Sequence, residues 1–562
     1  MPASSRNLPV PRLIASAAAL GDYLRATQRG DAAWNGSQAG IRLEDWLALG
    51  DDASEASWKT AQRLGLPLLR MAELAPQPQV VGLLPPETAR RLRAIPIAEA
   101  QGMVAVAMED PGDAERLASL DFILSQRVLA MVASAHDIRE AIAHHYDQVE
   151  DLSVARQLGL DPNVSSVETS EVEAQRLSKE KPVVRIVHGL IADAVARRAS
   201  DIHLRPGEQG ADVLYRIDDE MVPVRRFMRA LVPAVVSRIK VLAVMNLAEH
   251  RRPQDGRTTF VLDDGRKVDL RVSVLPAVFG ESVVIRLLDT DESLWNVEQL
   301  GLTAADRQCL DDIMERSHGM FLTTGPTGCG KSTTLYAMLL ELRQQRINIL
   351  TIEDPVEFYI EDIQQMQVNR AVNFTFASAL RNFLRHDPDV IMVGEIRDRE
   401  TAEIAVESAL TGHLVLSTLH TNTAAATVTR LLDLGVESYL LRASLLAVMS
   451  QRLVRLTCQH CKEVEEVSAH VRERLGVAPD EVFYRGRGCS HCEGLGVFKR
   501  RAVYELMLIS PRIQALIKPG AAADEIHQVA IEEGMTPITQ AAVAVAREGA
   551  ISLSEAWRVR AD

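Results

Sequence analysis

Apolar residues along the chain fall into short continuous runs and helix-like periods, which together predict alternating strands and helices. The run 319–324 predicts a short buried strand, and 334–340, which follows a glycine-rich turn, predicts a helix. Further strand-like runs at 348–357, 389–398 and 412–422 are flanked by charged residues or histidines. Strands that alternate with helices predict an α/β unit with a mostly parallel sheet.

The sequence before this unit has a mixed pattern that predicts two α+β regions. Short strands are expected at 94–97 and 103–108, and a helix at 135–146 is expected to close the first region. The second region begins with an amphipathic helix at 183–198. It continues at 260–272 with two alternating strands joined by an Asp-Gly turn, a pattern typical of a β-hairpin.

These patterns divide the chain into successive parts. In order they are a flexible leader at 1–40, an N-terminal α+β domain at 41–146, a linker at 147–180, a second α+β domain at 181–290, the strand–helix core at 291–456, a cysteine-bearing segment at 457–507 and a helical C-terminal region at 508–562. The linker is predicted because its residues are polar and acidic and have no apolar period.

Composition describes a globular chain with an acidic balance. Of its 562 residues, 47% are hydrophobic and 25% are charged, and 62 basic against 76 acidic side chains give a net charge of −14. Nucleic-acid binders carry a basic footprint, so no nucleic-acid partner is expected. No run approaches the roughly 18 apolar residues that a membrane helix requires.

A phosphate-binding pattern lies between the strand and the helix predicted first. The motif G-x-x-x-x-G-K-[ST] is matched by Gly325, Pro326, Thr327, Gly328, Cys329, Gly330, Lys331, Ser332 and Thr333. Its glycines let backbone N–H groups converge on phosphate oxygens at the positive end of a helix. Lys331 is expected to reach the β- and γ-phosphates, and the Ser332 hydroxyl to hold Mg²⁺. A chance glycine turn is the plainer alternative, but the strand–loop–helix context favours ATP or GTP binding.

Two of the predicted strands end in carboxylates that suit nucleotide chemistry. Glu353 ends the first and is expected to orient or deprotonate the attacking water, with a solvated acidic turn as the alternative. Glu395 follows four apolar residues of the second, which suits a role at Mg²⁺ and the water. Gly394 stands where many such ATPases have an aspartate, so Glu395 is expected to act alone.

Histidines stand at both ends of the predicted strand 412–422. His413 and His420 are seven residues apart, a spacing that does not bring both to one metal ion. A lone histidine is more often a packed core residue than a functional one. After a strand that ends in a glutamate, the two are expected to sense the γ-phosphate or to couple subunits.

Four of the six cysteines form two C-x-x-C pairs. They are Cys458, Cys461, Cys489 and Cys492, with 27 residues between the pairs. Such knuckles indicate a structural Zn²⁺ site with four thiolates and no open coordination position. Free thiols, a histidine ligand from His460 or His491, and a zinc ribbon for nucleic acid are the alternatives. The mixed charge around the pairs argues against the last of these.

Together, the phosphate loop, acidic strand, Gly-Glu strand and paired histidines resemble the secretion and pilus assembly ATPase superfamily, type II secretion ATPases included. The likeness extends to Leu384-Arg385-His386-Asp387-Pro388-Asp389, Ala199-Ser200-Asp201-Ile202-His203 and Arg252-Pro253-Gln254-Asp255-Gly256-Arg257. It covers about residues 180–510 strongly and 60–146 weakly. It implies a RecA-like phosphate-loop core, a PAS-like domain before it, and an N-terminal adaptor domain.

The same resemblance implies a homo-hexameric ring in which the domain 181–290 supplies arginines to bound nucleotide. Arg257, Arg271 and Arg286 are the candidates, because a planar guanidinium neutralises phosphate charge as it develops. An ordinary salt bridge is the alternative for each. Where the family usually has Arg-x-Arg-x-Asp-Gly, residues 214–219 have lost one arginine and the glycine, so Arg216 is a weaker candidate.

In the resembling family the N-terminal domain docks onto a membrane-anchored partner. Inner-membrane platform and anchor proteins are therefore expected partners, and a cytoplasmic location attached to the inner membrane through them is implied. Some relatives bind cyclic-di-GMP through a repeated Arg-Leu-Gly motif. The N-terminal region of this chain has one copy, at Arg63, and no convincing second copy, so cyclic-di-GMP binding is not expected.

The function implied is ATP hydrolysis that drives pseudopilus assembly in type II secretion. Type IV pilus extension is the alternative within the family, and a nucleotide-gated adaptor with weak catalysis is the alternative outside it. A DNA-translocating ATPase is disfavoured by the acidic balance. The apolar stretch 13–20 after Arg6 and Arg12 faintly resembles a signal peptide, but a machine that uses cytosolic nucleotide favours a frayed or amphipathic leader.

Overall fold

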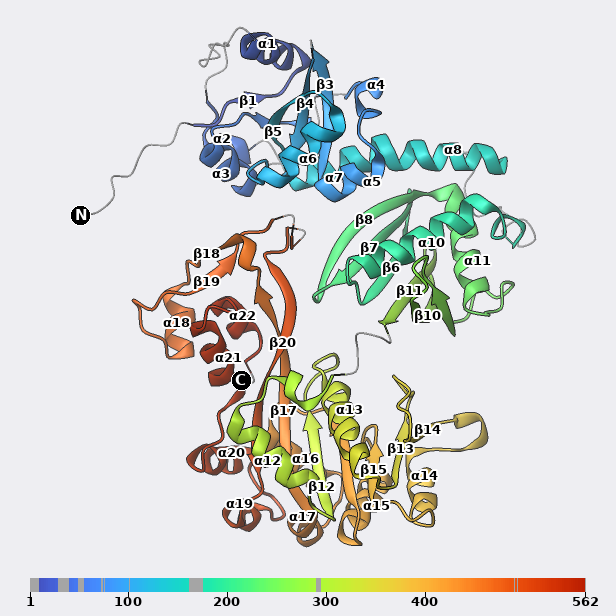
Figure 1. Cartoon of the computed structure of the whole chain (residues 1–562), viewed down its shortest axis with the longest axis vertical. Coiled ribbons are helices and arrows are strands. Elements are labelled where there is room, and N and C mark those ends of the chain that lie inside the picture. The colour runs from blue at the N-terminus through green and yellow to red at the C-terminus, as the bar shows by residue number, and fades with distance from the viewer. Residues whose placement is uncertain are drawn as a thin grey trace. The chain divides into compact units, whose positions relative to one another are not determined.

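The computed structural model describes residues 10–28, 40–48, 55–71, 74, 76–100, 102–160, 175–289, 295–489, 491–492 and 494–560. The chain forms two compact units, the first reaching to Leu288 and the second containing nearly all of the chain from Asp289 onward. Each unit has sheets and hydrophobic clusters of its own (Figure 1). Among the described residues, no helix combines the length and the apolar character needed to cross a bilayer.

The first unit begins with a five-stranded sheet in the order β1-β2-β5-β4-β3. Its strands are β1 (Leu13–Ile14), β2 (Leu68–Leu69), β3 (Ala94–Ala100), β4 (Met103–Met108) and β5 (Arg127–Val132). Its helices are α1 (Ala17–Gln28), α2 (Leu43–Leu47), α3 (Glu55–Leu64), α4 (Pro78–Val81), α5 (Pro86–Leu92), α6 (Ala114–Leu124) and α7 (Ala135–Ile142). Strand β4 is buried along its whole length, which accounts for its continuous apolar run and confirms the predicted strand there.

The predicted flexible leader is wrong over residues 10–28. Leu13 and Ile14 form β1 and pair in parallel with β2, and α1 follows directly. Ile14, Leu20 and Leu24 are buried in the hydrophobic cluster of this domain. The apolar stretch that resembled a signal peptide is therefore part of a folded core, while 1–9 and 29–39 lie outside the described residues.

The predicted linker is also wrong in part, because helix continues beyond α7. A π-helical turn, η2 (Ala143–Asp147), leads into α8 (Gln148–Leu158). On α8, the buried carboxylate of Asp151 accepts hydrogen bonds from Nη2 of Arg225 at 2.8 Å and from the backbone N–H of Met228 at 2.7 Å. This long-range pairing stabilises a helix whose own sequence is polar; the remainder of the linker prediction, at 161–174, lies outside the described residues.

The second sheet of the first unit has six antiparallel strands in the order β8-β7-β6-β11-β10-β9. They are β6 (Asp201–Gly207), β7 (Gly210–Ile217), β8 (Glu220–Met228), β9 (Gln254–Val261), β10 (Lys267–Ala277) and β11 (Gly280–Asp289). Helices α10 (Lys181–Ala196) and α11 (Val232–Leu242) pack apolar side chains such as Val187 and Ile239 against one face. The predicted helix and hairpin are both confirmed, with Gly265 at positive φ in the turn.

The second unit is built on a seven-stranded sheet in the order β14-β13-β15-β16-β12-β17-β20. Its strands are β12 (Gly319–Thr324), β13 (Ile349–Glu353), β14 (Gln364–Gln367), β15 (Val390–Val393), β16 (Leu414–Leu419), β17 (Leu445–Thr457) and β20 (Val497–Leu508). All neighbours are parallel except β17 and β20, which pair antiparallel. The predicted parallel α/β core is confirmed, and β20 extends it beyond the predicted boundary at 456.

Helices cover both faces of this sheet. They are α12 (Ala304–Met314), α13 (Lys331–Leu342), α14 (Phe376–Phe383), α15 (Arg399–Leu410), α16 (Ala424–Asp433) and α17 (Ser438–Ser444). Alternate residues of β12 serve the two faces, because Phe321 packs with α12 and α13 while Met320 and Leu322 pack with α14 to α17. The strands are thus buried on both sides, which explains their unbroken apolar runs.

The rest of the second unit follows β17. A two-stranded sheet of β18 (Lys462–Val464) and β19 (Tyr484–Gly486) with helix α18 (Ala469–Leu475) forms the cysteine-bearing segment. After β20 come α19 (Pro511–Leu516), α20 (Ala523–Glu532), α21 (Ile538–Arg547) and α22 (Leu553–Arg558), as predicted for a helical C-terminal region. Buried carboxylates hold helix N-termini here, for example Glu505, which accepts from the N–H groups of Ala424 and Ile538.

Candidate nucleotide site

The phosphate loop joins β12 to α13 at the carboxyl edge of the parallel sheet. Gly325, Gly328 and Gly330 all have positive φ, so the loop depends on glycine. A Cβ on Gly325 would lie 2.5 Å from the carbonyl oxygen of Gln451, whereas one on Gly328 would meet nothing within 4 Å. The rim from Pro326 to Gly328 is exposed, which leaves room for a polyphosphate above the loop.

Lys331 begins α13 and folds its side chain back onto the loop. Its Nζ donates to the carbonyl oxygens of Gly325 and Pro326, both at 2.9 Å, and the residue is buried. Burial lowers the pKa of Lys331, the charge of Arg452 lowers it further, and the carboxylate of Glu395 opposes both. Ser332 beside it is exposed at the first turn of α13, in the position that a hydroxyl ligand of Mg²⁺ requires.

Glu395 follows β15 and lies close enough to Lys331 to influence its pKa. Its Oε2 contacts Nε of Arg397 at 2.6 Å and Nε2 of His420 at 3.6 Å. Gly394 before it has little space for a side chain, because a Cβ would lie 3.3 Å from both the Cα of Glu353 and the carbonyl oxygen of Ile352. The close approach of β13 thus disfavours a larger residue at position 394.

The two histidines at the ends of β16 lie at opposite edges of the sheet. His420 is beside Glu395, and burial followed by the charge of Lys331 lowers its pKa, so its imidazole is neutral at pH 7. His413 precedes the other end of the strand, where its Nδ1 contacts the carbonyl oxygen of Ser408 at 2.9 Å. Within one subunit, the prediction that His413 senses the γ-phosphate is therefore wrong; a role between subunits stays a prediction.

Glu353 ends β13 in a buried hydrogen-bond network. Its Oε2 accepts from the phenol of Tyr336, and its Oε1 accepts from Thr351 at 2.7 Å and weakly from Gln365 at 3.3 Å. Burial raises the pKa of Glu353 above its usual value, although these bonds oppose the rise. Both oxygens are engaged, so water activation by Glu353 would need one bond to open, and that role stays a prediction.

Sequence reasoning missed two residues on β17 that contact the phosphate loop. Gln451 donates from Nε2 to the carbonyl oxygen of Cys329 at 2.8 Å and accepts from Thr334 at 3.0 Å. Arg452 is buried and sits next to Gly325, whose Cβ would lie 3.1 Å from Nη1. Their separation from the motif by more than a hundred residues leaves no local pattern that could have identified them.

The candidate arginines all lie on the second sheet of the first unit, on the face that α10 and α11 leave uncovered. Val268, Leu270 and Val272 on β10 are buried, so Arg271 between them points to the other face. Arg257 stands directly opposite Arg271 in the β9–β10 ladder. The pairing places two basic side chains next to each other on this face of the sheet.

Arg286 and Arg216 share the carboxylate of Asp201 on the same face. Nε of Arg286 lies 3.0 Å from Oδ1 of Asp201, and Nε of Arg216 lies 3.7 Å from Oδ2. The altered β7–β8 turn still forms, because Asp218 and Asp219 both adopt positive φ in place of the usual Asp-Gly. Arg216 therefore keeps a defined position, despite the lost glycine.

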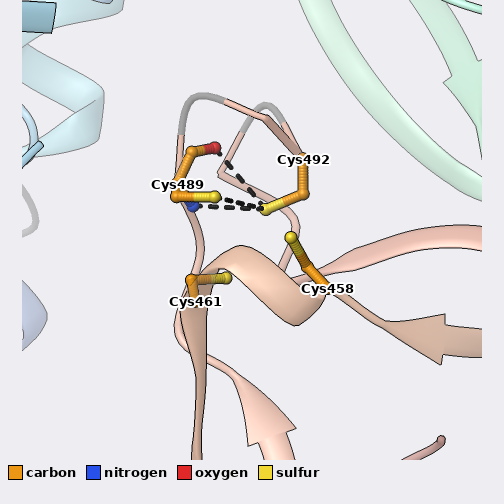
Figure 2. Close-up of side chains that lie close together, drawn as sticks. All are labelled: Cys458, Cys461, Cys489 and Cys492. Atoms are coloured by element: carbon orange, nitrogen blue, oxygen red, sulfur yellow. Dashed lines mark hydrogen bonds between the residues drawn. The ribbon is translucent and has the colours of Figure 1, made fainter. Parts of the chain in front are cut away.

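The four knuckle cysteines converge at the end of β17 (Figure 2). Their Sγ atoms all lie within 4.8 Å of one another, and those of Cys489 and Cys492 are 3.7 Å apart. The backbone N–H of Gly488 donates to Sγ of Cys461 at 3.2 Å. Four sulfurs at Zn–S distances of about 2.3 Å fit this spacing, so the cluster suits a closed Zn²⁺ site.

Comparison with models of known protein families shows which family this chain belongs to. The family described as type II/IV secretion system protein matches residues 176–558, which is more than half of the chain. This chain belongs to that family. The MshEN domain matches residues 64–152 as well.

The relatives of this secretion-family protein carry the names of two systems, type IV pilus assembly and type II secretion. The type IV pilus assembly ATPase PilB of Myxococcus xanthus is 39% identical over 531 residues, covering 93% of each chain. The type II secretion system protein E of Pseudomonas aeruginosa is 43% identical over 399 residues, covering 70% of this chain and 79% of its own. The ATPase DotB of Legionella pneumophila aligns with a TM-score of 0.51 at 21% identity, over 67% of this chain and 95% of its own, a likeness of fold alone.

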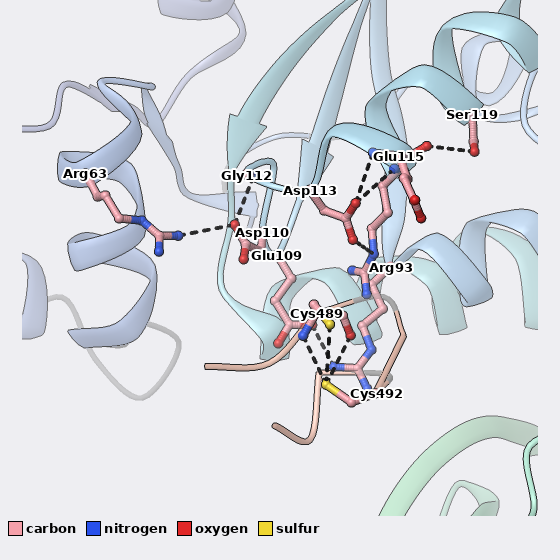
Figure 3. Close-up of polar contacts among 11 residues, drawn as sticks. Arg63, Arg93, Glu109, Asp110, Gly112, Asp113, Glu115, Ser119, Cys489 and Cys492 are labelled. Carbon is pink, nitrogen blue, oxygen red and sulfur yellow. Dashed lines mark hydrogen bonds and ion pairs between the residues drawn. The ribbon is translucent and has the colours of Figure 1, made fainter. Parts of the chain in front are cut away.

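At the start of the MshEN match, Arg63 of the N-terminal Arg-Leu-Gly copy lies beside a turn of acidic residues (Figure 3). Arg63 lies 3.5 Å from Oδ1 of Asp110, which also accepts from the N–H of Gly112. Asp113 caps the N-terminus of α6. In this arrangement Arg63 contributes to the packing of α3 against the turn.

Proposed function

We propose that this chain is a cytoplasmic ATPase that hydrolyses ATP to drive pseudopilus assembly in type II protein secretion. Family membership makes it an ATPase. The observation that carries the proposal is the grouping of Lys331, Glu395 and His420 around a glycine loop with an exposed rim. A polyphosphate bound there would meet a lysine, a helix N-terminus and an acid in one place.

Hydrolysis would proceed by in-line attack of water on the γ-phosphate, without a covalent intermediate. Lys331 would leave its carbonyl partners and donate to phosphate oxygens, and Glu395 would hold the water. When bound, Mg²⁺ neutralises phosphate charge, with the exposed Ser332 hydroxyl as its ligand. His420 would link Glu395 to the γ-phosphate through its neutral imidazole.

The arginine face would complete the site from another subunit of a homo-hexamer. Arg257, Arg271 and Arg286 are proposed to contact the nucleotide, with Arg216 in support through Asp201. Closure of this PAS-like domain onto bound nucleotide would convert ligand state into motion. The N-terminal domain is proposed to dock onto inner-membrane platform and anchor proteins, and the cysteine cluster to hold Zn²⁺ as a structural knuckle.

Type IV pilus extension is the second candidate. The observation in its favour is the Myxococcus relative, because that alignment covers 93% of both chains, the N-terminal region included. The secretion relative is more identical but covers 70% of this chain.

The deciding experiment replaces the native protein with Lys331→Ala in its host and measures secreted proteins and surface pili in the same culture. Loss of secretion with pili intact is the expected result. Loss of pili with secretion intact would transfer the motor to pilus extension, and no change in either would overturn both assignments.

In vitro, Glu395→Gln should bind ATP but hydrolyse it at least about 100-fold more slowly, because the amide cannot accept a proton from water. The exposed-surface variant Glu361→Gln serves as the control and should keep the wild-type rate. Unchanged hydrolysis in Glu395→Gln would favour a nucleotide-gated adaptor.

A further inference from the structure

Arg452 is a buried cation beside the phosphate loop. It lies on β17, and only 8% of the residue is exposed. Its Nη1 donates to the carbonyl oxygen of Gln451 at 3.0 Å. Its Nη2 donates to the carbonyl oxygen of Asn422 at 3.0 Å and contacts the Asn422 side-chain oxygen at 3.5 Å. The guanidinium therefore joins β17 to the loop that follows β16.

In the part of the chain that the structure describes, Arg452 forms no salt bridge, and the buried carboxylate of Glu505 acts on its charge only through space. Each of its hydrogen bonds goes to an uncharged carbonyl or amide oxygen. Burying a charge without an ionic partner costs free energy that neutral acceptors offset in part. Among the described residues, the other buried arginine, Arg116, is paired with Asp113 at 3.4 Å. The charge of Arg452 is thus only partly compensated, and its burial requires an explanation.

The location of Arg452 supplies one, because it adjoins the start of the phosphate loop. A Cβ placed on Gly325 would be 3.1 Å from Nη1 of Arg452. The carbonyl oxygen of the same glycine accepts a hydrogen bond from Nζ of Lys331. The two cations already interact, since the charge of Arg452 contributes to lowering the pKa of Lys331. An anion on the loop would relieve the repulsion between them.

We propose that Arg452 is a positioning residue whose buried charge, acting from behind the loop, strengthens binding in proportion to the number of phosphate groups on the nucleotide. The inference rests on the proposed ATP site and adds a second fixed cation to it. Polyphosphate adds negative charge to that of Glu505, while the two backbone bonds hold the guanidinium and the loop after His420 in a fixed relation.

Calorimetric titration of the full chain with AMP, ADP and ATP in Mg²⁺ buffer tests this. Arg452→Gln should lose roughly tenfold or more in affinity for ATP, less for ADP and little for AMP, because the lost attraction grows with ligand charge. Arg452→Lys, which keeps the charge and changes the hydrogen bonds, should recover most of the difference. The exposed Arg512→Gln removes the same charge from a surface helix and should match wild type.

A merely structural role gives a different result. If Arg452→Gln and Arg452→Lys both lose the same factor for all three nucleotides, or if neither loses affinity, the proposal is overturned. Thermal unfolding of each variant establishes that it is folded. If the Arg452→Gln variant is unfolded, the Arg452→Lys variant and the dependence of wild-type binding on added salt decide the question. Wild-type protein that binds none of the three nucleotides would instead overturn the proposed function.

Discussion

At the scale of single residues, the surroundings of a carboxylate decide what it can do. Glu395 lies among charged groups, with a lysine, an arginine and a histidine near it, and so belongs to a site that handles charge. Glu353, although it also ends a strand of the same sheet, is enclosed by the hydroxyls of Tyr336 and Thr351. One glutamate thus lies in a cluster of charged side chains, whereas the other is held in a buried network of hydrogen bonds.

The pKa of Glu353 leads to a prediction about stability. The raised pKa means that folded protein holds the carboxyl proton to higher pH than unfolded protein does. Its contribution is therefore fully present below the usual value of 4.5 and is lost as pH rises through the folded pKa. Glu353→Gln does not titrate, so its stability relative to wild type should rise as pH increases above about 4.5.

Chemical unfolding of wild type and Glu353→Gln across a pH series measures this difference. Exposed Glu361→Gln is the matched control and should follow wild type at every pH. A constant difference between Glu353→Gln and wild type would contradict the raised pKa.

Sequence analysis predicted the site residues that belong to short local motifs. Lys331 and Glu395 were predicted because a loop–helix turn and a strand end leave local patterns. Gln451 and Arg452 could not be found in this way, because only the pairing of β17 with β12 brings them under the loop. For a related reason the γ-phosphate role of His413 fails within one subunit, since strand direction decides which end of β16 lies at the phosphate loop, whereas its role between subunits stays a prediction.

At the scale of elements, some helices and strands form because of tertiary contacts that the hydrophobic pattern of the sequence does not reveal. The central strands and the β9–β10 hairpin were predicted because burial on two faces, or a tight turn, marks the sequence directly. Strand β1 and helix α8 were missed, because a two-residue strand and a polar helix carry no period of their own. Each is held by a partner far along the chain, β2 for one and Arg225 for the other.

The cysteine knuckles give a prediction at this scale. Protein purified under reducing conditions should carry about one Zn²⁺ per chain, because four thiolates form a closed site. Cys458→Ser with Cys461→Ser should abolish the zinc and lower the melting temperature, since metal binding contributes to folding. Atomic emission and thermal unfolding measure the two effects.

Cys309→Ser is the control, because Cys309 is half-buried outside the cluster. It should keep both the zinc and the stability. Native protein in which thiol reagent labels all four knuckle cysteines at once would show that they hold no metal.

At the scale of the whole molecule, the proposed hexamer requires arginines from one subunit to act on nucleotide in the next. Lys331→Ala inactivates the phosphate loop of its own subunit but leaves the arginines intact. Arg271→Ala removes one of the arginines but leaves the phosphate loop intact. Neither should hydrolyse ATP alone. Mixed one to one in a ring, they should restore activity at about a quarter of the interfaces, where an intact core meets an intact arginine face.

Steady-state ATPase measurements on the mixture check this expectation. Mixing Lys331→Ala with Glu395→Gln is the control and should restore nothing, because both changes lie in the core and each core lacks one residue. Equal inactivity of both mixtures would mean that the arginines act within their own subunit, and activity of Arg271→Ala alone would mean that this arginine takes no part in hydrolysis.

Strand β17 pairs with β12 only as far as Ser450, and from there to Thr457 it pairs with β20 alone. The stretch that begins beneath the phosphate loop and ends at the cysteines is thus a two-stranded ribbon, with α21 and α22 behind it. Such a ribbon is a lever arm of roughly 20 Å. A tilt of about 5° at its root would carry the cysteine end through roughly 2 Å, so a small rotation beside the phosphate loop would become a larger displacement at the cysteines.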